Sequence, residues 1–322
     1  MTLFDYPENP CPAGAVVEMI TARDGMTLRT ARWPSLSPQP KGTICLFQGR
    51  SEFIEKYYEV IRDLRARGFA VATLDWRGQG GSDRLLRDPR PGHIRDFSEY
   101  GRDIEAFMRQ IALPECPPPF YGLAHSMGSS ILFANLPPGS SWFERLVVTA
   151  PMIDIKDKPP GARLIARSLS AIGLAERLVP GWSPRPVGLK PFEGNPVTSD
   201  PTRYGVSSMM AQRTPQIAIG GPTIGWIKAA FDVMDKLGNP HFGAHWRIPT
   251  LVFLAGADGV VSTLAAQHFT AKLRATRILT LPGARHEIMQ ERDSIRDAFW
   301  AAFDAFIPGT REQDADARSE AI

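Results

Sequence analysis

The chain has 322 residues and a formal net charge of +3, from 37 Lys and Arg against 34 Asp and Glu. Charges of both signs are interspersed along the chain, so no basic stripe forms and we expect no nucleic-acid partner. The length suits either two ordinary domains or one large α/β domain that carries an insertion. The three cysteines, Cys11, Cys45 and Cys116, are far apart and odd in number, which argues against a disulfide framework and favours a reducing compartment.

The first residues, MTLFDYPENPCPAG, lack the positive region and the apolar run of a signal peptide. No later run of about 18 apolar residues could span a bilayer. We therefore expect a soluble, cytoplasmic protein and leave open a peripheral contact with the inner face of the membrane. The sequence does not indicate an oligomeric state.

In chain order, two strand-like runs at 15–25 and 27–33 flank a turn at Asp24 and Gly25, which predicts an antiparallel hairpin at a sheet edge. Short β-branched or aromatic runs then alternate with helical patterns. This alternation predicts a mostly parallel sheet. The segments concerned are 42–49, 55–68, 69–78, 100–111 and 145–151.

Residues 152–246 interrupt this pattern, because they are rich in Pro, Gly and Met and contain helical stretches but no good buried strand. Such a segment is too long for a structureless loop. Strand-like runs return at 248–262 and 276–287, and an amphipathic helix closes the core. We therefore predict a core of residues 1–151 and 247–308, a helical insertion at 152–246, and a polar, disordered tail at 309–322.

The segment YGLAHSMGSS, at 121–130, places Ser126 among small residues directly after a short apolar run. Gly128 two positions later and Ala124 two positions earlier nearly complete G-x-S-x-G, the strand-to-helix turn that presents a nucleophilic hydroxyl. A serine in such a segment can also be an ordinary turn residue. The rest of the chain has to decide between these interpretations.

A serine hydroxyl is a poor nucleophile unless a base removes its proton and a third group orients that base. Asp258 follows the apolar run TLVFLAGA, and His286 lies in the loop after RILTLPGA. Taken singly, Asp258 could be a turn residue and His286 a loop histidine. Together they give the order Ser, Asp, His at three predicted strand ends, as in α/β-hydrolases. We predict Ser126 as the nucleophile, His286 as its base and Asp258 as the orienting acid.

Such chemistry also needs two donors that hold the oxyanion of the tetrahedral intermediate. One is predicted to be the backbone N–H of Met127, directly after the nucleophile. The other is predicted to be the backbone N–H of Arg50 in QGRSEF, where Gly49 lets the chain turn.

Other candidate motifs do not indicate a cofactor or a metal. The glycines at 78–81 match neither G-x-G-x-x-G nor a P-loop, so we predict no nucleotide. His241 and His245 are four residues apart, but no Glu completes H-E-x-x-H, and Pro240 and Gly243 argue against a continuous helix. His125, beside Ser126, is expected to be structural.

Several motifs together resemble the serine α/β-hydrolases of the bacterial lysophospholipase and monoacylglycerol lipase branch. DWRGQGGSDR resembles the D-x-R-G-x-G-x-S loop of that family, GHIRDFSEYGRDI its next conserved segment, and LAHSMG its G-H-S-M-G turn. NPVTSDPTRY and GGPTIGWIKAAF resemble the caps of bacterial lysophospholipases. The resemblance covers residues 15–306. This chain departs from the family pattern at two places. Ala124 stands where relatives usually have Gly, and Gln48 and Phe53 replace the two histidines of H-G-x-x-E-H.

The resemblance implies an α/β-hydrolase fold of about eight strands with 152–246 as a helical cap over the carboxyl edge of the sheet. It implies a serine ester hydrolase that cleaves a lysophospholipid through an acyl-enzyme. The alternatives are a monoacylglycerol lipase, a broad carboxylesterase, or a catalytically silent protein that binds lipid or a partner. Phe53, Met209, Met210 and Trp226 are candidates for an acyl-chain pocket. Arg50, Arg77 and Arg84 are candidates for a polar rim at the mouth of the site that accepts a phosphate head group.

Overall fold

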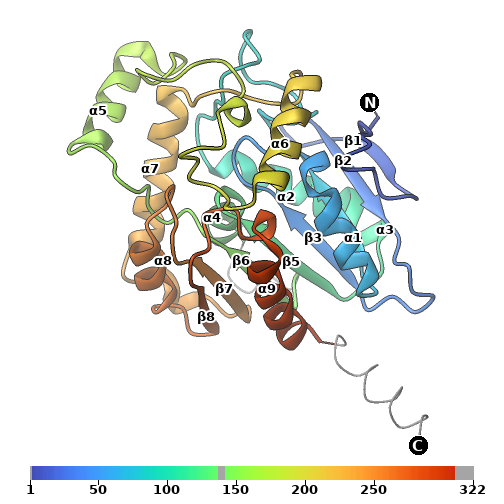
Figure 1. Ribbon diagram of the computed structural model, residues 1–322. Helices are drawn as coiled ribbons and strands as arrows, with labels where there is room; N and C mark the ends of the chain where they lie inside the picture. The colour runs from blue at the N-terminus through green and yellow to red at the C-terminus, as the bar shows by residue number, and fades with distance from the viewer. Residues whose placement is uncertain (1, 137–141, 309–322) are drawn as a thin grey trace, which may run out of the picture.

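A computed structural model describes residues 2–136 and 142–308 (Figure 1). Its centre is an eight-stranded sheet with the order β1-β2-β4-β3-β5-β6-β7-β8. β1 (Val16–Thr21) and β2 (Thr27–Trp33) form the predicted antiparallel hairpin, and β2 pairs antiparallel with β4. The remaining pairs are parallel, which confirms the mostly parallel sheet. The predicted tail, 309–322, lies outside the described residues.

The parallel strands are near-continuous apolar runs, as expected for strands that helices cover on both faces. Their bounds are β3 (Thr43–Phe47), β4 (Ala70–Leu74), β5 (Phe120–His125), β6 (Arg145–Thr149), β7 (Thr250–Ala255) and β8 (Thr276–Leu281). Every residue of β3, β4, β5 and β7 is buried. β8 lies at the edge of the sheet, and most of its residues are exposed.

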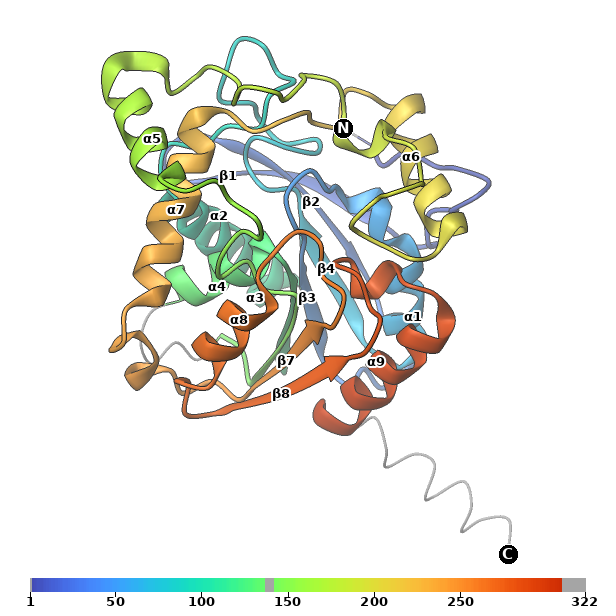
Figure 2. The ribbon, with the colours of Figure 1, turned by 60° about the vertical axis from the view of Figure 1, so that its left-hand side comes forward.

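Helices form a layer on each face of the sheet (Figure 2). One layer contains α1 (Tyr58–Ala66) and α9 (Asp293–Phe306); the other contains α2 (Ser98–Phe107), the short α3 (Leu113–Glu115), α4 (Met127–Asn135) and α8 (Thr263–Thr270). Successive side chains of a strand point to opposite faces. Ile44 and Leu46 of β3 accordingly join the hydrophobic cluster of α1 and α9, whereas Cys45 and Phe47 join that of α2 and α4.

Between β6 and β7 the chain forms α5 (Ala162–Leu169), α6 (Pro201–Arg213) and α7 (Ile224–Gly238), at one end of the sheet (Figure 1). Side chains cap two of these helices. Asp200 accepts hydrogen bonds from two N–H groups of the first turn of α6, and Thr223 accepts one at the start of α7. The loops after β3, β4 and β8, at the carboxyl ends of these strands, hydrogen-bond to this segment.

The three helices of this segment differ in how they meet the core. α7 packs on α4, and Trp226, Phe231 and Met234 belong to the same hydrophobic cluster as the sheet. α6 packs instead in a small separate cluster with Tyr6 and Phe53. Part of the inserted segment is therefore continuous with the main core.

Candidate active site

Ser126 lies at a sharp turn between β5 and α4, with φ 49° and ψ −112°. A non-glycine residue adopts positive φ only at some cost in strain, which is typical of a turn that presents a nucleophile. The turn brings α4 very close to the end of β3. A Cβ on Gly128 would lie 2.6 Å from the carbonyl oxygens of Phe47 and Gln48. The methyl group of Ala124, in contrast, is accommodated in the buried interior of the sheet.

The structure brings the three residues predicted for the chemistry into one hydrogen-bonded chain. The Oγ of Ser126 lies 2.9 Å from Nε2 of His286, and Nδ1 of His286 lies 2.8 Å from Oδ2 of Asp258. Asp258 follows β7, His286 follows β8, and all three side chains are buried. Parallel strands end at one edge of the sheet, which is why residues 160 positions apart can meet.

The second oxygen of the Asp258 carboxylate is also bonded. Its Oδ1 accepts hydrogen bonds from the N–H groups of Val260 and Val261, at 2.7 and 2.9 Å. Burial raises the pKa of this carboxyl, but His286 and the two N–H groups outweigh that effect and hold the pKa below its usual value. Asp258 is therefore ionised and oriented toward His286.

The loop after β3 presents one free amide at the predicted oxyanion site. The N–H of Gly49 donates to Glu52, and the N–H of Ser51 donates to the Oε1 of Gln79. The amide of Arg50, between them, has no hydrogen-bond partner in the described part of the chain. Met127 is the first residue of α4, so its N–H lacks a partner within the helix.

Sequence reasoning missed the residues that hold this loop. Glu52 accepts hydrogen bonds from the N–H of Gly49 at 2.5 Å, the hydroxyl of Tyr57 at 2.7 Å and Nζ of Lys56 at 2.8 Å. Gln79 donates to the carbonyl oxygens of Gly49 and Glu52. Burial disfavours the charge of Glu52, but Lys56 outweighs it and the pKa is about 2. The Glu of H-G-x-x-E-H, which this chain retains as Glu52, was the available signal.

His125 lies directly under this site. Its ring centroid is 4.8 Å from that of His286, and its Nδ1 lies 3.0 Å from Oγ1 of Thr149. Burial lowers the pKa of His125 to about 4. The imidazole is therefore neutral near pH 7 and fills space beneath the site.

The four candidates for an acyl-chain pocket lie in two different places. Phe53 and Met210 are buried together, with Met209 packed against them, in the small cluster under α6. Trp226 is buried in the main core, and the guanidinium of Arg50 lies over its ring at 5.0 Å. The structure thus does not bring all four together.

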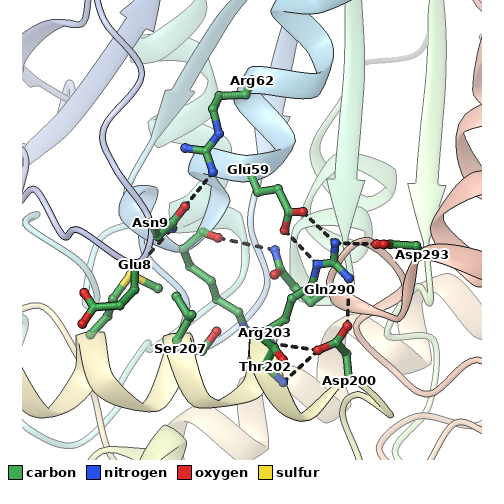
Figure 3. Close-up of a pocket in the computed structure, with 13 residues that line it drawn as sticks. Glu8, Asn9, Glu59, Arg62, Asp200, Thr202, Arg203, Ser207, Gln290 and Asp293 are labelled. Atoms are coloured by element: carbon green, nitrogen blue, oxygen red, sulfur yellow. Dashed lines mark hydrogen bonds and ion pairs between the residues drawn. The ribbon is translucent and has the colours of Figure 1, made fainter.

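A pocket of about 380 Å³ lies between α1, α6 and the start of α9, away from the Ser126 chain (Figure 3). None of its lining residues is Ser126, His286 or Asp258. Arg203 lies in its wall and pairs with Glu59, Asp200 and Asp293, and Arg62 donates to Asn9. Because these charges satisfy one another, we interpret the pocket as a polar seam that joins α6 to the core.

Within residues 2–136 and 142–308, no group of three His, Cys, Asp or Glu side chains could hold a metal ion. No helix in the same ranges is long and apolar enough to cross a membrane. Cys11, Cys45 and Cys116 are free thiols.

A mostly parallel eight-stranded sheet with a serine at a strained strand-to-helix turn, and Asp and His after later strands, defines an α/β-hydrolase. A family model described as "Serine aminopeptidase, S33" matches residues 38–293, and the chain belongs to this family of hydrolases. The resemblance seen in the sequence is thereby confirmed.

Individual relatives agree with this assignment. The chain is 32% identical to Lysophospholipase L2 of Escherichia coli (strain K12), over 89% of this chain and 86% of that protein. It is 25% identical to the Monoacylglycerol lipase of Mycolicibacterium smegmatis, over 78% of this chain and 83% of that protein. A crystal structure of a soluble variant of monoglyceride lipase from Saccharomyces cerevisiae shares the fold, with a TM-score of 0.73 at 16% identity, covering 96% of this chain and 100% of that one.

Proposed function

We propose that the protein hydrolyses the acyl ester of a lysophospholipid. The observation that carries this proposal is the hydrogen-bonded chain from Asp258 through His286 to Ser126. Ser126 attacks the ester carbonyl while Nε2 of His286 takes the hydroxyl proton. Asp258 keeps the imidazole in the required orientation and stabilises its protonated form. Two residues act through their backbone, since the N–H groups of Arg50 and Met127 bind the oxyanion.

The remaining steps complete an ordinary ester hydrolysis. His286 passes its proton to the leaving alcohol, which departs and leaves an acyl group on Ser126. A water then attacks the acyl-enzyme with His286 again as the base. The products are a fatty acid and the glycerophosphate alcohol, and Ser126 regains its proton.

The substrate class rests on two relatives whose names point in different directions. Lysophospholipase L2 of Escherichia coli favours a lysophospholipid, and the Monoacylglycerol lipase of Mycolicibacterium smegmatis favours a neutral glycerol ester. The higher identity of the first supports the phospholipid. Residues 152–246 would act as the cap, with Phe53, Met209, Met210 and Trp226 supplying apolar surface to the acyl chain.

The proposal also includes contact with a lipid surface from the cytoplasmic side. Leu164, Ile165 and Ile172 of α5 and the adjacent η3 (Ser170–Leu174) are 71%, 54% and 71% exposed. Apolar side chains at such positions can enter the interface of a membrane or micelle. The three free thiols support a reducing compartment.

Hydrolysis of lysophosphatidyl esters and monoacylglycerols of matched acyl chain, each below its micelle concentration, tests the proposal. A buried CH₂ contributes about 0.8 kcal/mol, so kcat/KM should rise about fourfold per CH₂ until the acyl site is full. Preference for the glycerol ester would make the protein a monoacylglycerol lipase. A flat dependence on chain length would leave a general carboxylesterase. Hydrolysis of neither substrate would favour the silent lipid-binding alternative.

A further inference from the structure

Three arginines were candidates for the mouth of the site, and the structure separates them by their partners. Arg77 forms ion pairs with Asp24 and Asp103, both at 2.6 Å. Each guanidinium nitrogen of Arg84 donates to a backbone carbonyl, including that of Gln216 at 3.0 Å. Arg50 has no carboxylate partner in the described residues. Arg50 and Arg84 thus both keep a charge that no carboxylate of the described residues neutralises, and the hydrogen bonds of their guanidinium groups tell them apart.

The hydrogen bonds of the Arg50 guanidinium are also incomplete. Its Nη2 donates to the carbonyl of Gly220 at 2.7 Å and its Nη1 to Oγ of Ser51 at 2.9 Å. Its Nε is buried and has no partner. An unsatisfied buried donor normally requires an explanation, because its desolvation is not compensated. Burial lowers the pKa of Arg50 to about 10, so the group stays charged near pH 7.

The guanidinium of Arg50 lies at the junction between the core and the cap, next to a glycine, Gly92, that has no side chain to displace it. Residues 90–93 of the core are hydrogen-bonded to 220–223 of the cap, and the guanidinium lies beside this junction and over the ring of Trp226. A Cβ on Gly92 would stand 2.7 Å from Nη2 of Arg50, so a larger residue would displace the guanidinium.

A comparison with Arg65 indicates that this arrangement is unusual within the molecule. Arg65 is buried and forms no ion pair in the described residues, yet its Nε and Nη1 donate to the carbonyls of Pro34 and Ala13. Backbone oxygens thus satisfy a purely structural arginine in this fold. Arg50 keeps both a free donor and an unneutralised charge.

We propose that the Arg50 side chain binds the phosphate of the substrate while its own backbone N–H binds the oxyanion; this inference rests on the proposed function. The two ends of the residue match the two ends of a lysophospholipid. From backbone N to Cζ the arginine spans about six bonds of roughly 1.5 Å each, as does the path from ester carbonyl carbon to phosphorus. Arg presents a planar set of donors suited to phosphate oxygens.

Selectivity between a lysophosphatidyl ester and a monoacylglycerol of the same acyl chain tests the assignment. Arg50→Ala should lower the ratio of their kcat/KM values by about 10- to 100-fold, since one charged hydrogen-bonding partner is lost. The loss should lie mainly in KM of the phospholipid. Arg50→Lys keeps the charge without the planar donors, so its ratio should lie between those of Arg50→Ala and the wild type.

Arg84→Ala is the matched control, because Arg84 also links a core loop to the cap without an ion pair. Its selectivity ratio should remain that of the wild type. A second measurement does not depend on catalysis. Binding of an ether-linked lysophosphatidylcholine, compared with the corresponding alkyl glycerol, should weaken selectively in Arg50→Ala.

Two results would overturn the assignment. In one, Arg50→Ala lowers activity on both esters equally and leaves both ether ligands bound as before, which would make Arg50 structural. In the other, Arg84→Ala changes the ratio as much as Arg50→Ala does, which would assign selectivity to the junction itself. If the wild type hydrolyses neither ester but Arg50→Ala still weakens the phosphate-bearing ether, the proposed function fails while the phosphate site stands.

Discussion

The loops around Ser126 and the outer helix α5 are held by interactions of different kinds. Around Ser126 the polar groups are buried and multiply bonded, and Glu52 alone accepts three hydrogen bonds, from the loop and from the 3₁₀ helix η1 (Ile54–Tyr57). On α5, Arg163 and Arg167 form ion pairs with Asp232 and Asp235 of α7 whose side chains are 30–47% exposed. Buried polar networks fix geometry, whereas exposed ion pairs contribute little to stability.

This difference suggests a division of labour. The chemistry proposed for Ser126 depends on positions fixed by buried groups, whereas the outer part of residues 152–246 is joined to α7 by exposed ion pairs. The attachment of α6 is intermediate between the buried network around Ser126 and the exposed ion pairs of α5. Arg203 of α6 pairs with Glu59 of α1 and Asp293 of α9 (Figure 3). Substitutions in these three regions should therefore differ in the size of their effects.

The largest effect is expected from Glu52→Gln in the core. Removing one partner from a buried charged network costs about 3 kcal/mol, and an oxyanion donor that loses its support costs about 10² in kcat. Because Glu52 positions the loop rather than touching substrate, kcat should fall more than KM rises. Glu115→Gln, at an exposed ion pair with Arg32, is the control and should change the free energy of unfolding by less than about 1 kcal/mol. Wild-type kcat in Glu52→Gln would contradict the positioning role.

The pH dependence of stability should also report on the core. His125 has a pKa of about 4 in the folded protein and about 6.5 when unfolded, so the unfolded chain binds the extra proton between these values. The contribution of neutral His125 to the free energy of unfolding is fully present above pH 6.5. It is lost as the pH falls toward 4, by roughly 3 kcal/mol in total. Urea denaturation across this window should show a flatter slope in His125→Asn. An unchanged slope in His125→Asn would argue against a buried neutral imidazole.

The intermediate region is tested by a pair of arginine variants. Arg203→Ala removes ion pairs that are mostly shielded from water and should lower the free energy of unfolding by about 2 kcal/mol. Arg167→Ala removes two exposed pairs and should lower it by clearly less than Arg203→Ala does. Chemical denaturation of both variants measures the difference. Equal losses would mean that α5 is held as firmly as α6.

The smallest effect is expected at the outer surface of α5. Replacing both Leu164 and Ile165 with Glu should weaken sedimentation with phospholipid vesicles by about tenfold, because two apolar side chains no longer enter the interface. Activity on monomeric substrate should stay near the wild-type value. Leu36→Glu, at another exposed leucine, serves as the control. Unaltered vesicle binding by the double variant would place any lipid contact elsewhere.

Local motifs were sufficient to predict most of the fold and the relation of Ser126, Asp258 and His286. Ser126 and Asp258 directly follow apolar runs and His286 lies in the loop after another, and parallel strands bring such ends together whatever their separation in the chain. The hairpin at the sheet edge and the closing helix α9 were also readable from periodicity and turn residues.

The pairing of buried charges could not be predicted in the same way. Arg50, Arg77 and Arg84 look alike in the sequence, and only the fold supplies Asp24 to one and the carbonyl of Gln216 to another. Similarly, the composition of 152–246 predicts an insertion but not that α7 packs into the main core. Such contacts depend on segments more than fifty residues apart, about which local pattern carries no information.

The central claim, that Ser126 is an activated nucleophile, is tested most directly by covalent labelling. The folded protein is incubated near neutral pH with a fluorophosphonate, and the modified residue is located by mass spectrometry. The account predicts a single adduct on Ser126, none in Ser126→Ala, and much slower labelling in His286→Ala, because the base no longer accepts the hydroxyl proton. An unlabelled wild type, or equal labelling of the Ser126→Ala variant, would contradict it.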